Sequence, residues 1–296
     1  MSGVTHLRSI AISAQDPAGL LPFYEQVWGL HQVCTEADGA ILLRGAGQEH
    51  HVLALVPGTG RGLERIRLGA VDRGTVDALT ERVMASGAAV LEAPHEQEGA
   101  GGGYGVVFRD PEGRVVEVIA EMTEHEVLSG ATGPDRLSHV VLNSVNVAAS
   151  SSFYTEVLGF HVSDRYENDK MVFLRCNEKH HCIVLAQGEW TSLNHVAFEV
   201  KNADEVMKAL GRMRKSGIDT IWGPGRHGPG GNVFCYFTDP VGTVIEYTAE
   251  LLEVDDDWEP SVWSRTPENA DVWGTSGGIS PEVLEVMANP PIEADR

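Results

Sequence analysis

Several features are scarce in this 296-residue chain, and each scarcity excludes a class of protein. There are only four cysteines, and no two of them have the CxxC spacing of a zinc or redox site. Four cysteines are also too few for a disulfide scaffold, so we expect a reduced, cytoplasmic setting. Lysine and arginine total 22 against 43 acidic residues. The resulting net charge of −21 argues against nucleic acid or an anionic membrane surface as a partner.

Long apolar runs are missing as well. No segment approaches the length of a transmembrane helix, and the first ten residues, MSGVTHLRSI, lack the apolar core of a signal peptide. We therefore expect no membrane partner. Apolar residues make up 42% of the chain and charged residues 22%, which is typical of a soluble globular protein that can bury a substantial core.

What the chain does contain is an internal repeat. VVFRDPEGRVVEVIAE at 106–121 resembles FCYFTDPVGTVIEYTAE at 234–250, and the shared pattern places Glu117 over Glu246. Upstream, HLRSIAISAQDPAGLLPFYEQVWGL resembles HVVLNSVNVAASSSFYTEVLGF in the same way. A chain of two similar halves is expected to fold as two similar units. We predict an N-terminal domain over 1–125, a C-terminal domain over 135–250 and a C-terminal arm over 251–296.

Each half divides again into two βαβββ units. In the second half, residues 137–142 alternate like a strand, a helical stretch ends at 160, and short apolar strands follow at 171–175 and 181–185. A strand at 193–200 restarts the cycle. Because one such unit cannot cover its own sheet, we predict an α+β fold. Two units per half would close a curved sheet around a cavity.

Polar residues interrupt the inward faces of three strands in the second half. Because side chains alternate along a strand, His139, His195 and Glu246 each lie among apolar residues that face the core. A single inward histidine is usually a hydrogen-bonded core residue, whereas a single buried carboxylate is costly. Together the three could bind a divalent cation, and two histidines with one carboxylate form the facial triad of non-haem Fe(II) oxygenases.

The second half resembles the type I extradiol ring-cleaving dioxygenases of the vicinal oxygen chelate superfamily. The matching stretches are LSHVVL, HHCIVL, LNHVAFEV, GPGRHGPGGNVFCYFTDP and GTVIEYTAE, and the GPGRHG loop is closest to the homoprotocatechuate 2,3-dioxygenase branch. The resemblance implies Fe(II), or alternatively Mn(II), on His139, His195 and Glu246. It also implies an enzyme that opens a catecholic or dihydroxy-heteroaromatic ring beside its diol with O2, giving a semialdehyde-type product.

The same resemblance assigns catalytic roles to three more residues. His227 and Tyr236 stand at the family's separations from Glu246 and would be the substrate-side histidine and tyrosine. His181 would be the acid and base on the oxygen side. Strand alternation predicts that His181 points inward and His180 outward, although a register shift of a single residue would exchange their roles.

The glycine spacing of the GPGRHG loop also resembles a nucleotide-binding motif. It matches the dinucleotide pattern GxGxxG, but a strand rather than a helix follows it, which excludes that use. Trp222 precedes the loop where the homoprotocatechuate branch carries an arginine for the substrate carboxylate. This departure favours an apolar, aromatic or heteroaromatic diol, and Trp190 is a second candidate for the same pocket.

The first half is expected to bind no metal. It keeps His6 and Glu117, but Leu68 stands where His195 would be, so its site is incomplete. Its expected role is to support the second half and the contacts of a homo-oligomer. Exposed sheet edges and a tryptophan-bearing tail also suggest self-association, and the resemblance points to a tetramer.

Two other functions remain open at this point. The superfamily also contains metal-dependent isomerases and thiol transferases, which typically draw their ligands from both copies of the repeat. It further contains metal-free resistance proteins that bind small molecules, a function that would not need three intact ligands.

Overall fold

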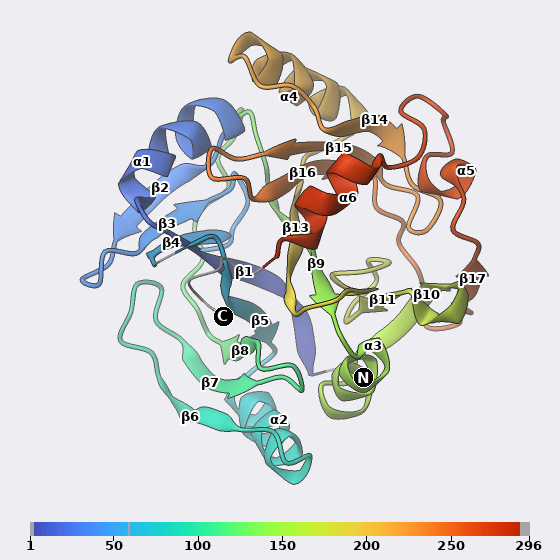
Figure 1. The fold of residues 1–296 in the computed structure, drawn as a ribbon. Coiled ribbons are helices and arrows are strands. Elements are labelled where there is room, and N and C mark those ends of the chain that lie inside the picture. The colour runs from blue at the N-terminus through green and yellow to red at the C-terminus, as the bar shows by residue number, and fades with distance from the viewer. Residues whose placement is uncertain (1–2, 59, 291–296) are drawn as a thin grey trace.

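Two large β-sheets form the framework of the molecule, which the computed structural model describes over residues 3–58 and 60–290 (Figure 1). The first sheet has the strand order β2-β3-β4-β1-β5-β8-β7-β6. Its strands are β1 (Val4–Ala14), β2 (His31–Thr35), β3 (Ile41–Arg44), β4 (Leu53–Pro57), β5 (Leu63–Ala70), β6 (Val90–Glu96), β7 (Tyr104–Arg109) and β8 (Val115–Ala120).

The second sheet has the order β14-β15-β16-β13-β9-β12-β11-β10-β17. Its strands are β9 (Arg136–Ser144), β10 (His161–Tyr166), β11 (Met171–Arg175), β12 (Ile183–Gln187), β13 (Ser192–Glu199), β14 (Trp222–Arg226), β15 (Val233–Thr238), β16 (Val244–Ala249) and β17 (Ser261–Trp263). Without β17, each sheet consists of two four-stranded units joined by an antiparallel pair, β1 with β5 and β9 with β13. The predicted α+β fold of four βαβββ units is therefore confirmed.

A helix follows the first strand of every unit. These helices are α1 (Pro17–Pro22) with the π-helical turn η1 (Phe23–Trp28), α2 (Arg73–Ala85), α3 (Val147–Ser152) with η2 (Phe153–Val157), and α4 (Ala203–Lys215); a short turn, η3 (Glu167–Asp169), follows β10. Each of the four helices begins at an Asp or Asn side chain that accepts a hydrogen bond from the backbone N–H three residues on. In α4 the buried residues recur at helical spacing, so one face packs on β15 and β16.

A matching pair of hydrogen bonds joins the two halves. Tyr24 donates to Asp239 Oδ2 over 2.9 Å, and Tyr154 donates to Asp110 Oδ2 over 3.4 Å. All four side chains are buried. The two tyrosines are equivalent in the repeat, and so are the two aspartates. Each half therefore supplies the tyrosine that binds the turn of the other half, which gives a physical reason for both motifs to occur twice.

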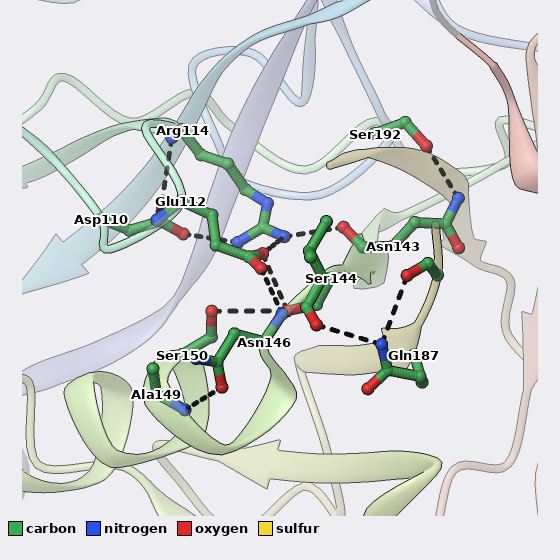
Figure 2. A network of polar contacts seen from close by, with 12 residues as sticks. Asp110, Glu112, Arg114, Asn143, Ser144, Asn146, Ala149, Ser150, Gln187 and Ser192 are labelled. Atoms are coloured by element: carbon green, nitrogen blue, oxygen red, sulfur yellow. Dashed lines mark hydrogen bonds and ion pairs between the residues drawn. The ribbon is translucent and has the colours of Figure 1, made fainter. Parts of the chain in front are cut away.

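Arg114 extends this contact to the end of β9 (Figure 2). Its guanidinium donates to Asp110 Oδ2 and to the backbone carbonyl of Asn143, each over 2.7 Å. Glu112, in the same turn, accepts a hydrogen bond from the backbone N–H of Asn146 over 2.7 Å. The turn between β7 and β8 therefore holds the C-terminal end of a strand that carries a candidate metal ligand.

The C-terminal arm packs on the second sheet. β17 extends this sheet by pairing in parallel with β10, and α6 (Pro281–Ala288) lies against β13 (Figure 1). The short helix α5 (Pro267–Ala270) lies between them in the chain. Among the described residues, none of the helices has the length and apolar composition needed to cross a membrane. The domain boundaries drawn from the repeat stay a prediction, and the last residues of the arm lie outside the described part.

The pair formed by Arg114 and Asp110 should contribute strongly to stability, because their side chains are only 3% and 0% exposed. Arg114→Met would leave Asp110 as an unpaired buried charge, and we expect the free energy of unfolding to fall by about 3 kcal/mol. Arg165→Met is the matched control, since Arg165 and its partner Asp169 are 40% and 49% exposed and should contribute less than about 1 kcal/mol. Urea unfolding measures both variants, and equal losses would contradict the expectation.

Candidate metal centre

The three inward polar residues of the second half meet in the middle of the sheet. β9 carries His139, β13 carries His195 and β16 carries Glu246, and these three strands are neighbours. Within the ladder, His139 pairs with Ala197 on β13, and Ala197 pairs with Glu246. All three candidate ligands are buried, and their ligand atoms lie within 4.8 Å of one another.

The orientation of these side chains fits a metal ion better than it fits mutual hydrogen bonds. Nε2 of His139 and Nε2 of His195 each lie 3.3 Å from Glu246 Oε2. Within the described residues, however, His195 Nε2 and Glu246 Oε2 are buried atoms without a hydrogen-bond partner. Leaving such atoms unpaired is costly. A divalent cation between them would satisfy all three residues, and this donor set suits Fe(II).

A relay of two amides orients His195. Asn143 Nδ2 donates to the backbone carbonyl of Met287 over 2.8 Å, and Asn143 Oδ1 accepts from Asn194 Nδ2 over 2.9 Å. This leaves Asn194 Oδ1 to accept from His195 Nδ1 over 2.8 Å. The proton of His195 is therefore on Nδ1, and the lone pair is on Nε2, where a metal would bind. Met287 belongs to α6, so the arm takes part in orienting the ligand.

The protonation states of the centre also suit a cation. Burial raises the pKa of Glu246, but His139 and His195 outweigh burial, so the net pKa lies below its usual range. Burial lowers the pKa of His195 by more than Glu246 raises it. An ionised carboxylate therefore faces a neutral imidazole, and both groups are in the form that binds a metal.

His227 and Tyr236 form a hydrogen-bonded pair next to this centre. The ring of Tyr236 lies 5.0 Å from that of His195. His227 Nδ1 donates to the backbone carbonyl of Ala270 over 2.9 Å, so His227 Nε2 accepts from the Tyr236 hydroxyl over 3.0 Å. Burial lowers the pKa of His227 to about 4 and raises the pKa of Tyr236 well above its ordinary value. At neutral pH both groups are uncharged, and the phenol oxygen can still accept a hydrogen bond.

His181 lies where it was expected, but His180 does not. His181 lines the cavity, and its ring is 4.5 Å from that of His139. The prediction that His180 points outward is wrong: its side chain is fully buried, and its Nδ1 lies 2.9 Å from His181 Nδ1. Strand alternation does not apply here because both histidines precede β12. The backbone N–H of His180 instead donates to the carbonyl of Leu252 in the arm.

The second sheet and the arm together line a cavity of about 930 Å³. Both tryptophans that were expected in the pocket line it, and the ring of Trp222 stacks on that of Tyr236 at 5.1 Å. The indole N–H of Trp190 donates to the carbonyl of Ala288 in α6 over 2.7 Å. Apart from the fully buried Glu246, the residues predicted from the sequence all line this cavity: His139, His181, His195, His227, Tyr236, Trp190 and Trp222.

The equivalent point of the first half has a different composition. Ser9 on β1 pairs with Arg67 on β5, and Arg67 pairs with Glu117 on β8, which is the register described above for the second sheet. Ser9 therefore stands where the second half has its first histidine, and Arg65 stands where it has its second. Glu117 Oε2 accepts from Arg65 Nη1 over 3.0 Å and from Arg67 Nε over 2.9 Å. Two guanidinium groups thus neutralise the buried carboxylate.

This arrangement corrects the expected counterparts of the ligands. His6 and Leu68 had been matched to ligand positions, and both assignments are wrong. The first strands of the two halves were aligned on their histidines, whereas the backbone ladder aligns Ser9 with the first ligand. His6 pairs with Gly69 in the ladder, and its Nε2 lies 2.7 Å from Glu49 Oε1.

Sequence reasoning missed the residues that orient the functional side chains. Asn143, Asn194 and Asp164 hydrogen-bond to histidines or to each other, and apart from the neighbours Asn194 and His195 the bonded residues are separated in the chain. The sequence does contain one sign of a histidine that contacts His181, because the dipeptide His-His occurs at corresponding places in both halves, at 50–51 and 180–181.

Two family models match the chain, one on each half. The model of the Glyoxalase/Bleomycin resistance protein/Dioxygenase superfamily matches residues 136–247, and the model of a glyoxalase-like domain matches residues 9–119. The two matches cover the two copies of the internal repeat. They also cover the strands that carry the candidate ligands and their first-half counterparts.

Three proteins illustrate the similarity of this chain to known sequences and structures. The Mn(II)-bound glyoxalase from Novosphingobium aromaticivorans is 38% identical, with a TM-score of 0.90, over 96% of this chain and 94% of its own. Metapyrocatechase 2 from Cupriavidus necator is 32% identical over 201 residues, which are 60% of this chain and 61% of that protein. The manganese-dependent 2,3-dihydroxybiphenyl 1,2-dioxygenase from Geobacillus genomosp. 3 is 26% identical over 82% of this chain and 84% of its own. The match to the metapyrocatechase thus spans less than two thirds of that protein.

The buried histidines should make the metal-free protein less stable in mild acid. Burial lowers the pKa of His227 to about 4, against about 6.5 in an unfolded chain, and lowers that of His181 well below its ordinary value. Below pH 6.5 the unfolded state binds more protons, so their contribution to stability is complete above that pH and falls as the pH approaches 4. His227→Gln should remove about 3 kcal/mol of this loss. Chemical unfolding of both proteins from pH 7 to 4 measures the difference, and parallel curves would contradict it.

Proposed function

Because the chain belongs to the Glyoxalase/Bleomycin resistance protein/Dioxygenase superfamily, we propose that it is an extradiol dioxygenase. It would open a catecholic ring next to the two adjacent hydroxyls, incorporate both atoms of O2 and release a semialdehyde-type product. The observation that carries this proposal is the presence of His181, His227 and Tyr236 around a buried two-histidine, one-carboxylate centre in a single cavity.

Fe(II), or Mn(II) in its place, is the proposed metal, with His139, His195 and Glu246 as its ligands. Two of the relatives described above have manganese in their names. Held by these residues, the metal would supply Lewis acidity toward the hydroxyls of the diol and binding positions for the diol and O2. The chain contributes an ionised carboxylate and an imidazole whose Nε2 is kept free of its proton.

Tyr236 and His227 are the proposed acceptors of a substrate proton. A hydroxyl of the diol can donate to the Tyr236 oxygen while the phenol donates to His227 Nε2. The bond from His227 Nδ1 to Ala270 keeps Nε2 aimed at the phenol. A proton can therefore pass from the diol to Tyr236 as the phenol proton passes to His227. Acid–base assistance of this kind contributes roughly 10²–10⁴ in rate.

His181 is the proposed acid and base on the oxygen side of the substrate. Its position beside His139 puts it next to the proposed metal ligands without making it one of them. Burial, and then the nearby His139, lower its pKa well below the ordinary value, so it is neutral at physiological pH. A neutral imidazole can accept the second proton of the diol at Nε2 and donate it to an oxygen atom of O2 when the O–O bond breaks.

The cavity favours a bulky diol with an uncharged substituent. Its volume of about 930 Å³ lies near the upper end of the range for small-molecule sites. Trp222 and other apolar side chains line it. Lys170 and Arg265 also line it, but so do Glu189 and Glu285, so the charged lining residues are balanced in sign. We therefore propose an apolar or aromatic substituent on the ring.

A metal-dependent isomerase is the second candidate, because the 38% identical relative is named a glyoxalase. An enzyme of that type is expected to draw its metal ligands from both halves of the chain. Here the three candidate ligands all come from the second half, and two arginines stand at the equivalent point of the first. This distribution favours the dioxygenase.

Metal content and oxygen uptake test the proposal together. The protein should bind about one divalent ion per chain and, after anaerobic loading with Fe(II), consume O2 with apolar-substituted catechols. His195→Ala should lose both metal and oxygen uptake, whereas His6→Ala, in the first half, should keep both. Metal analysis and an oxygen electrode provide the two readouts. Two tightly bound ions per chain would contradict the single centre, and no uptake across a panel of catechols and hydroxypyridines would contradict the dioxygenase.

We also propose a homo-oligomer, with a tetramer as the expected size. The arm exposes apolar side chains, among them Val262 at 66% and Trp273 at 48%, which a partner subunit could cover. Light scattering at micromolar concentration should give a mass several times that of one chain. A monomer under these conditions would contradict the expectation.

A further inference from the structure

We propose that His180 and Asp164 are positioning residues that hold His181 with a proton on Nδ1 and a bare Nε2 facing the cavity. His180 lies between the two: its Nδ1 is 2.9 Å from His181 Nδ1, and its Nε2 is 3.1 Å from Asp164 Oδ2. Their exposed fractions are 0% for His180, 3% for His181 and 1% for Asp164. The expected effect on catalysis rests on the function proposed above, whereas the hydrogen-bond geometry does not depend on it.

Asp164 is fixed as a hydrogen-bond acceptor by the arm. The backbone N–H of Ser261 donates to Asp164 Oδ1 over 2.8 Å, and the indole N–H of Trp263 donates to Oδ2 over 2.7 Å. Neither donor can act as an acceptor, so Asp164 must accept from both. The same carboxylate accepts from His180 Nε2, which therefore carries a proton. Strand β17 thus completes the environment of a residue on β10.

The protons of the two histidines follow from this anchor. A neutral His180 with its proton on Nε2 has a bare Nδ1. Since two bare nitrogens would not approach to 2.9 Å, His181 must donate from its Nδ1. Its Nε2 is then left without a proton, as an acceptor toward the cavity.

The first half contains the same histidine pair without this anchor. His50 Nδ1 and His51 Nδ1 are 3.0 Å apart, and the rings meet at 85°, against 86° in the second half. The ladder positions put Cys34 where the second half has Asp164. In addition, Arg67 Nη1 lies 2.6 Å from His51 Nε2, so the nitrogen that would face a ligand is already occupied. His50 is therefore a matched control for His180.

Two substitutions at position 180 separate hydrogen bonding from packing. His180→Phe fills the space but offers neither a donor nor an acceptor. His180→Gln fills it less well but keeps one acceptor for His181 and one donor for Asp164. If the hydrogen bonds matter, the Gln variant should resemble wild type. If packing alone matters, the Phe variant should be the better of the two.

The first measurement needs no metal and no activity. ¹⁵N NMR of histidine-labelled, metal-free protein should show His181 with a protonated Nδ1 and a bare Nε2. His180→Gln should keep this pattern, and His180→Phe should lose it. A protonated Nε2 on His181 in the wild type would overturn the proposal, and so would an unchanged pattern in the Phe variant.

The second measurement follows the reaction of O2 with the Fe(II)-loaded protein after anaerobic binding of a catechol. His180→Phe should bind metal and catechol normally but slow the oxygen step by about 10- to 100-fold, the range seen when the partner of a functional histidine is removed. His180→Gln and His50→Phe should stay close to wild type. A Gln variant as slow as the Phe variant would overturn the proposal. Wild-type protein that consumes no O2 would instead refute the proposed dioxygenase, while the NMR pattern would still decide the role of His180.

Discussion

A buried carboxylate at the centre of each sheet is the constraint on which the rest of the structure depends. Glu117 and Glu246 are both 0% exposed, and a sheet interior cannot hold a carboxylate without compensation. The first half compensates with Arg65 and Arg67, which are part of the chain and both donate to Glu117 Oε2. The second half offers Glu246 two imidazoles and, at 3.4 Å, the side-chain amide of Asn232, and burial keeps the imidazole of His195 neutral, so a bound cation would supply the compensating charge. The same fold therefore holds one carboxylate paired with arginines and one carboxylate that could bind a cation together with two histidines.

The ladder explains where the ligands lie, but it does not explain which nitrogen of each imidazole is free. Strand pairing fixes a backbone position, whereas the tautomer depends on the acceptor that meets the other nitrogen. Those acceptors trace largely to the arm: Ala270 accepts directly from His227, Met287 acts on His195 through two asparagines, and Trp263 anchors the aspartate next to His180. The arm thus helps to orient the histidines of the site in addition to lining the cavity.

The sequence predicts the structure well where the alternation of apolar and polar residues, or the internal repeat, determines it. Alternation located most strands of the second half, although not β10, and the inward position of the candidate ligands, because a buried strand leaves a clear pattern. It failed for His180, which lies in a connection where alternation has no meaning. The alignment of His6 with His139 is wrong because two strands can be aligned on a residue type and still differ in register. The relays could not be predicted, since Asp164 and Trp263 meet only through tertiary packing.

The arm also connects the pocket wall to the candidate metal centre. Both pocket tryptophans are held by arm carbonyls, Trp190 by Ala288 over 2.7 Å and Trp222 by Gly277 over 3.0 Å. The carbonyl of Met287, which orients His195 through the two amides, directly precedes Ala288 in the chain. The arm therefore contacts both the pocket wall and the groups that set the imidazole tautomers. In the proposed dioxygenase, one segment of the chain would therefore influence both substrate range and reactivity.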